Sequence, residues 1–111
     1  MKKSEIKFII ELDEQNVPNK IVWDATDSPH GKAEEAKAIA LSIWDQTQQQ
    51  TMRIDLWAKD MPVVEMKRFF IETIGGMAET IKSATDDNIM AEKMHELCKE
   101  LVKHVETEHK L

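Results

Sequence analysis

The chain has 111 residues, a net charge of −6 and one cysteine, Cys98. Its length is that of one domain, which we expect to extend over residues 1–111. Charged residues at 32% and apolar residues at 41% favour an ordinary globular protein over a disordered one. The composition excludes collagen-like and mucin-like classes. A disulfide scaffold is excluded because one cysteine cannot form an intramolecular disulfide.

Neither half of the chain is basic. Residues 1–60 hold 8 Lys and Arg against 11 Asp and Glu, and residues 61–111 hold 7 against 10. We expect no nucleic-acid binding, because a phosphate-binding surface needs a clustered excess of positive charge. The longest apolar run, Ala38–Leu41, is far shorter than the ~20 residues that cross a bilayer, so we expect no membrane span.

The first residues imitate the positive end of a signal peptide, with Lys2-Lys3 after the initial Met. However, Glu5, Lys7 and Glu11 interrupt the apolar segment that an export signal would need. We therefore expect a chain without an export signal, located in the cytoplasm. A single reduced cysteine agrees with this location, because the cytoplasm keeps thiols reduced.

Alternating apolar and charged residues over residues 5–12 predict a half-buried strand. Its apolar face holds Ile6, Phe8, Ile10 and Leu12. Turn-forming residues over 13–19 and a β-rich run over 20–24 follow, which together predict a hairpin with a longer loop. Residues 26–32 contain Pro and Gly and are expected to form a surface connection.

The apolar residues over 33–50 fit both the period of a helix and that of a strand. Helical spacing relates Ala36, Ile39, Ala40, Ile43 and Trp44. Strand alternation relates Ile39, Leu41 and Ile43 equally well. We prefer the strand, because residues 52–59 alternate clearly and need an antiparallel neighbour. Residues 46–51 would then form the loop of a second hairpin.

After Asp60 the period becomes helical, and Pro62 suits a first turn. The apolar stripe of this helix consists of Met66, Phe69, Phe70, Thr73, Ile74, Met77 and Ile81. Gly75-Gly76 interrupts it. Since each glycine costs about 1 kcal/mol relative to Ala, we expect the helix to end or bend there, or its backbone to pack closely on the sheet.

Candidate N-caps over residues 84–88 precede a last helix. Its stripe consists of Met90, Met94, Leu97, Cys98, Leu101, Val102 and Val105. Together the elements predict an α+β fold: a four-stranded antiparallel sheet made of two hairpins, with the two C-terminal helices packed on one face. The other face of the sheet is expected to stay open to water.

The open face carries the candidate binding residues. The core face of the second hairpin takes Ile39, Leu41, Ile43, Met52, Ile54 and Leu56. The open face then presents Trp44, Arg53, Asp55 and Trp57 beside the small residues Ala38, Ala40 and Ser42. Because Trp and Arg dominate the energetics of protein interfaces, we interpret these four residues as a partner-binding site.

Three alternatives to this partner-binding site stay open. Arg53 could stack on Trp44 as an intramolecular cation–π contact. The chain's own ends could cover the face. If residues 33–50 are a helix instead, Trp44 is a core residue.

No catalytic pattern is present in the sequence. The serines lie in no glycine-flanked elbow, and Gly75-Gly76 lacks the spacing of a phosphate loop. We expect no enzyme activity, no cofactor and no metal. The alternative is a small-ligand or metal site on the last helix, using His95, Glu100 and His104. The simpler interpretation of Glu100 and His104 is a solvated pair four residues apart.

Several short motifs resemble those of a known family. They are Lys3-Ser4-Glu5-Ile6-Lys7-Phe8, Glu11-Leu12-Asp13-Glu14, Met52-Arg53-Ile54-Asp55-Leu56-Trp57, Lys59-Asp60-Met61-Pro62, Met66-Lys67-Arg68-Phe69 and Thr73-Ile74-Gly75-Gly76. The chain resembles the gliding-motility-associated protein GldC family of Bacteroidetes over nearly its whole length. The stretch from Arg53 to Pro62 is the most specific part of the resemblance.

The resemblance implies an accessory role in gliding over surfaces, with protein partners among the gliding proteins or the associated secretion machinery. It brings no enzymatic activity, cofactor or binding residue. A cytoplasmic member of this family would act indirectly or at the inner face of the inner membrane. Self-association through the open face or through a sheet edge is a further alternative.

Overall fold

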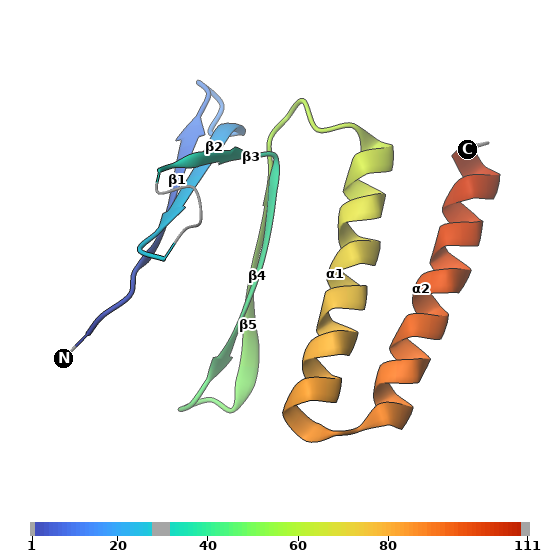
Figure 1. Cartoon of the computed structure of the whole chain (residues 1–111). Coiled ribbons are helices and arrows are strands. Elements are labelled where there is room, and N and C mark those ends of the chain that lie inside the picture. The colour runs from blue at the N-terminus through green and yellow to red at the C-terminus, as the bar shows by residue number, and fades with distance from the viewer. Residues whose placement is uncertain (1, 28–31, 110–111) are drawn as a thin grey trace. The chain divides into compact units, whose positions relative to one another are not determined.

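The computed structural model describes residues 2–27 and 32–109. The chain forms two compact units, residues 1–61 and residues 62–111. Within the described residues, the first unit contains five strands in two antiparallel sheets and the second contains two helices (Figure 1). The predicted α+β class is therefore confirmed.

The first sheet has three antiparallel strands in the order β1-β2-β3. These strands are β1 (Ile6–Leu12), β2 (Pro18–Ala25) and β3 (Glu34–Ala36). Strands β1 and β2 form the predicted first hairpin. The register pairs Phe8 with Trp23 and Ile10 with Ile21, so the apolar alternation of both strands falls on one face.

The second sheet is the ladder of β4 (Ala38–Asp45) and β5 (Gln50–Trp57), the second predicted hairpin. It resolves the ambiguity of residues 33–50 in favour of the strand. Eight consecutive cross-strand pairs connect the two strands, from Ala38 opposite Trp57 to Asp45 opposite Gln50. The turn closes with Gln49 at a φ of 52°, a left-handed conformation.

The strands form two sheets, so the prediction of one four-stranded sheet is wrong in this respect. The three-residue strand β3 occupies the free edge of β2, with Ile21 opposite Ala36 and Trp23 opposite Glu34. The chain then bends at Lys37, and β4 pairs only with β5. The sequence gives little sign of β3, because three residues are too few to display an alternation.

The core of the first unit lies where the two sheets meet. The amide N–H of Ala58 donates to the carbonyl of Lys37 over 2.8 Å, and the N–H of Lys59 donates to the carbonyl of Pro18 over 3.0 Å. These bonds join the end of β5 to the start of β2 and to the β3–β4 bend. Ile21 and Ala58 are completely buried there.

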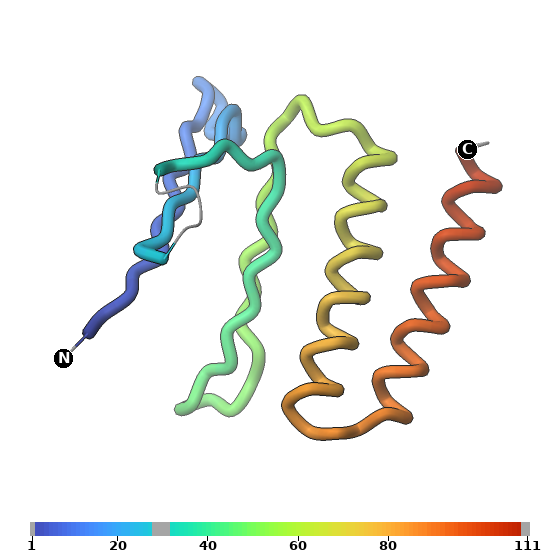
Figure 2. The backbone as a smooth tube through the Cα atoms, viewed as in Figure 1, coloured from blue at the N-terminus to red at the C-terminus, as the bar shows by residue number. Residues whose placement is uncertain are grey.

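The second unit is a hairpin of two antiparallel helices, α1 (Val63–Thr85) and α2 (Asn88–His109), whose tight turn is visible in the backbone trace (Figure 2). Asp86 ends α1 in a left-handed conformation, with its N–H donating to the carbonyl of Lys82. The carboxylate of Asp87 accepts the N–H of Met90 over 2.9 Å and so caps α2. The predicted caps of the last helix are confirmed.

Helix α1 continues through Gly75 and Gly76, which excludes the first of the three alternatives, that the helix ends there. Gly75 lies against α2, where a Cβ atom would be 3.9 Å from the Sγ atom of Cys98. The thiol of Cys98 donates to the carbonyl of Ile71 over 3.5 Å. Position 75 therefore lies at the contact between the two helices, with room for an ordinary van der Waals contact.

Some predictions are not tested by these features. Most of the expected connection over residues 26–32 falls on residues 28–31, which lie outside the described residues, as does His30. The packing of the helices on a sheet face and the organisation as a single domain stay predictions. Neither α1 nor α2 has an apolar stretch long enough to cross a membrane.

Candidate functional site

The β4–β5 ladder brings the four predicted binding residues to one face. Residues directly opposite in an antiparallel ladder share a face, and every second pair lies on the same side. The pairs on this side are Ala38 with Trp57, Ala40 with Asp55, Ser42 with Arg53 and Trp44 with Thr51. We call this side of the ladder the polar face. Its composition is the one that strand alternation predicts.

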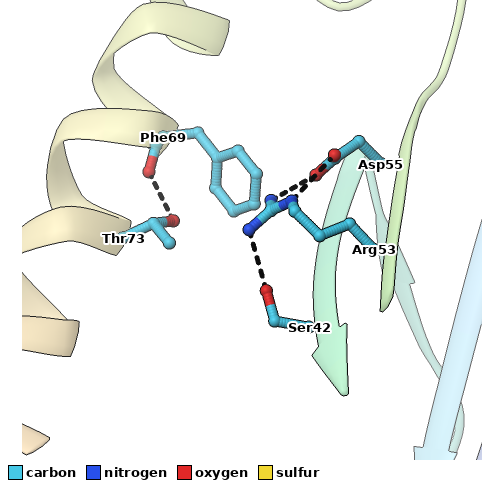
Figure 3. A network of polar contacts seen from close by, with 5 residues as sticks. All are labelled: Ser42, Arg53, Asp55, Phe69 and Thr73. Carbon is cyan, nitrogen blue, oxygen red and sulfur yellow. Dashed lines mark hydrogen bonds and ion pairs between the residues drawn. The ribbon is translucent and has the colours of Figure 1, made fainter. Parts of the chain in front are cut away.

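Arg53 occupies the middle of the polar face (Figure 3). Its Nη2 atom donates to Oδ1 of Asp55 over 2.7 Å, and its Nε atom donates to Oδ2 over 3.2 Å. Its Nη1 atom donates to the hydroxyl of Ser42 over 2.8 Å. The guanidinium is thus held in a bidentate pair with one carboxylate and by a third bond across the ladder.

The ion pair shifts the pKa of both partners. The hydrogen bond from Arg53, helped by its charge, lowers the pKa of Asp55 in spite of partial desolvation. The hydrogen bond to Asp55 and its charge raise the pKa of Arg53. Both groups therefore stay charged near neutral pH, and together they present a neutral pair in a fixed geometry.

The two tryptophans lie toward opposite ends of the polar face. Trp44 is 63% exposed on β4 and Trp57 is 52% exposed on β5. The register places them six residues apart along the ladder, which is about 20 Å at 3.3 Å per residue. The described residues contain no cation–π contact between Arg53 and Trp44. Stacking of Arg53 on Trp44 is therefore not what holds the first tryptophan.

The opposite side of the ladder is apolar. It carries the six residues that were predicted to face the core: Ile39, Leu41, Ile43, Met52, Ile54 and Leu56. The register agrees with that prediction, but the burial does so only in part. Ile43, Met52 and Ile54 are about half exposed, whereas Ile39, Leu41 and Leu56 are more covered. A two-stranded ladder has no further strand to shield its far end.

The histidines of α2 do not assemble into the alternative metal site. The Nε2 atom of His95 lies 3.0 Å from Oε1 of Glu79 on α1. In the described part of α2, the carboxylate beside His104 is that of Glu108, 3.8 Å away, instead of the predicted Glu100. Across residues 2–27 and 32–109, no three His, Cys, Asp or Glu side chains come together as a metal site would require.

Sequence reasoning missed a groove between α1 and α2. Its volume is about 470 Å³, and it is lined by Val64, Glu65, Arg68, Ile71, Glu72, Val102, Val105 and Glu106. The spacing of Val64, Arg68 and Ile71 by four and three residues could have indicated a shared helix face. This spacing is easily overlooked, because the stronger apolar stripe of α1 includes neither Val64 nor Ile71.

Comparison with known proteins adds one finding. A family model described as gliding motility-associated protein GldC-like matches residues 18–107, a range that contains the whole β4–β5 ladder and nearly all of both helices. No curated protein and no solved structure matches the chain.

Proposed function

The chain belongs to the GldC-like family of gliding motility-associated proteins, and from this premise we propose that it is a non-enzymatic adaptor that binds a protein partner through the polar face of β4–β5. The partner would be a component of the gliding apparatus or of the associated secretion machinery. The protein would act in the cytoplasm, indirectly or at the inner face of the inner membrane.

The exposure of Trp44 and Trp57 around a prearranged ion pair is the observation that carries this proposal. A few residues dominate the binding energy of a protein interface, and Trp and Arg are common among them where water is excluded. Arg53 and Asp55 already form an ion pair with two hydrogen bonds. A partner could therefore cover them without leaving an unpaired charge. Ala38 and Ala40 leave the surface between the aromatic anchors shallow.

The first test is affinity capture from a native lysate of a gliding bacterium. Wild-type protein would be compared with Trp57→Ser and with Ile9→Ser, which alters an equally accessible apolar residue, 61% exposed, in the other sheet. We expect wild type and Ile9→Ser to recover the same gliding or secretion component and Trp57→Ser to lose it. Tryptophan fluorescence, which reports on the strands, and circular dichroism, which reports mainly on the helices, would establish that each variant is folded.

Two outcomes would contradict the proposed function. One is equal recovery by Trp57→Ser and wild type; the other is loss of recovery with Ile9→Ser as well. If Trp57→Ser fails to fold, Trp44→Ser provides the same test at the more exposed tryptophan. Light scattering on the purified protein would show whether a second copy, rather than a different protein, covers the face.

A further inference from the structure

The α1–α2 groove belongs to a different unit from the polar face and has a different chemistry. We propose that it docks an amphipathic α-helix of a partner protein, with the apolar stripe of that helix between α1 and α2 and Lys or Arg on its flanks. This inference goes beyond the proposed function, because it gives the protein a second binding surface. An adaptor that joins two components needs two binding surfaces.

The floor of the groove is aliphatic. By floor we mean the aliphatic residues of the lining, which are Val64 and Ile71 of α1 and Val102 and Val105 of α2. Val64, Ile71 and Val105 are half-buried, and Val102 is 40% exposed. Val64 and Ile71 are seven residues apart, which is about two helical turns or 10 Å. That length suits a stripe of side chains spaced by three and four residues on a docking helix. Burying such a stripe would remove apolar surface of both molecules from water.

The rim of the groove is acidic on both sides. By rim we mean the exposed charged residues of the lining, which are Glu65 and Glu72 of α1 and Glu106 of α2, with Arg68 as the one basic residue. Arg68 is paired with Glu72 over 3.4 Å. Among the described residues, Glu65 and Glu106 have no ion-pair partner. Two uncompensated carboxylates therefore flank the apolar floor, and they favour an occupant with positive charge on both flanks.

The arrangement suits a helix better than a small ligand. A small-molecule pocket usually contains a few convergent polar groups that fix the orientation of the ligand. Here the floor is aliphatic, and the polar residues stand at the rim, where the Arg68 and Glu72 side chains are mostly exposed. Apolar contact below and charge contact at the edges is the pattern by which helices bind in grooves.

The test uses a labelled synthetic peptide of about 18 residues, a length sufficient for several helical turns. The peptide carries a leucine stripe and lysine flanks, and a matched peptide carries glutamate in place of the lysines. Fluorescence anisotropy would measure binding to the full chain. We expect the lysine peptide to bind at least about tenfold more tightly than the glutamate peptide. Amide NMR shifts on addition of peptide should concentrate at residues 64–72 and 102–106.

Charge variants separate the groove from the net charge of the protein. Glu65→Gln combined with Glu106→Gln should weaken binding of the lysine peptide about tenfold. Glu92→Gln combined with Glu96→Gln makes the same charge change at exposed positions of α2 outside the groove. It should leave binding unchanged. Val102→Ser should also weaken binding of the lysine peptide, because it removes apolar surface from the floor of the groove.

Three results would overturn the inference. They are equal weakening by the two double variants, amide shifts away from the groove, and binding of dodecylammonium but not of the lysine peptide. The last would identify a site for a small cationic amphiphile. Trp57→Ser should bind the lysine peptide like wild type, so failure of the groove and failure of the polar face are distinguishable.

Discussion

Asp13 organises the turn between β1 and β2 through both oxygens of its carboxylate. Its Oδ1 atom accepts the N–H groups of Gln15 and Val17 over 2.8 and 3.0 Å, while Oδ2 lies 3.2 Å from the Nζ atom of Lys59. Hydrogen bonds from Val17 and Gln15, and then from Lys59, lower the pKa of Asp13. The left-handed conformation of Asn16, at a φ of 63°, belongs to the same turn.

The lowered pKa of Asp13 predicts a dependence of stability on pH. Its stabilising effect is present above about pH 4, where the unfolded carboxyl is also ionised, and it is lost as the pH falls through the lower folded value. In Asp13→Asn the amide oxygen can still accept the two N–H groups, but the charge is gone. We expect a lower melting temperature than wild type at pH 7 and a shallower decrease between pH 5 and pH 2.

Melting temperatures across this pH range would check the Asp13 prediction. Asp55 and Glu108 also have lowered pKa values, through Arg53 and Lys67 respectively. These two groups titrate in wild type and in Asp13→Asn alike. The difference between the two melting-temperature profiles therefore isolates the effect of Asp13. Glu14→Gln controls for the loss of one negative charge in the same turn. Identical profiles for wild type and Asp13→Asn would contradict the assigned role.

At the scale of the element, α1 keeps two consecutive glycines inside a helix of 23 residues. Glycine weakens a helix interior, because its backbone loses more conformational freedom on folding than that of alanine. The environment of the two positions differs. A Cβ at Gly75 would meet Cys98 at an ordinary contact distance, whereas a Cβ at Gly76 would meet nothing within 4 Å.

These environments predict that alanine is tolerated at both positions. Gly76→Ala should raise the free energy of unfolding by about 1 kcal/mol, through the helix propensity alone. Gly75→Ala should give a similar gain, because the added methyl group fits against Cys98. Urea denaturation of each variant measures the change. A loss of stability in Gly75→Ala would mean that the helices need a closer approach than 3.9 Å implies.

At the scale of the whole molecule, the two units carry different spectroscopic signals. The three tryptophans, Trp23, Trp44 and Trp57, all lie in residues 1–61. Both helices lie in residues 62–111. Tryptophan fluorescence therefore reports on the strands, and circular dichroism at 222 nm reports mainly on the helices.

This separation tests the prediction of a single domain. Coincident transitions by different probes are the mark of cooperative two-state unfolding. We expect thermal and urea unfolding of the full chain to give the same midpoint by fluorescence and by circular dichroism. Two resolved midpoints would show that the units unfold independently and would make the single-domain prediction wrong.

The sequence predicted local features whose periods are long enough to be read. Alternating residues predicted β1 and β5, and two long apolar stripes predicted α1 and α2. The alternation of β4 competed with a helical period, and the strand was preferred because β5 needed an antiparallel neighbour. Strand alternation also predicted that Trp44, Arg53, Asp55 and Trp57 share a face, because every second residue of a strand points to the same side. The short motifs from Arg53 to Pro62 predicted the family.

Other features depended on which elements meet, and the tertiary structure alone decided them. Strand β3 takes the edge of β2 and divides the strands into two sheets. The turn between α1 and α2 pairs His95 with Glu79 and creates the groove at Val64 and Val102. A sequence fixes which way a side chain points along its own element, whereas partners and cavities arise between elements distant in the chain.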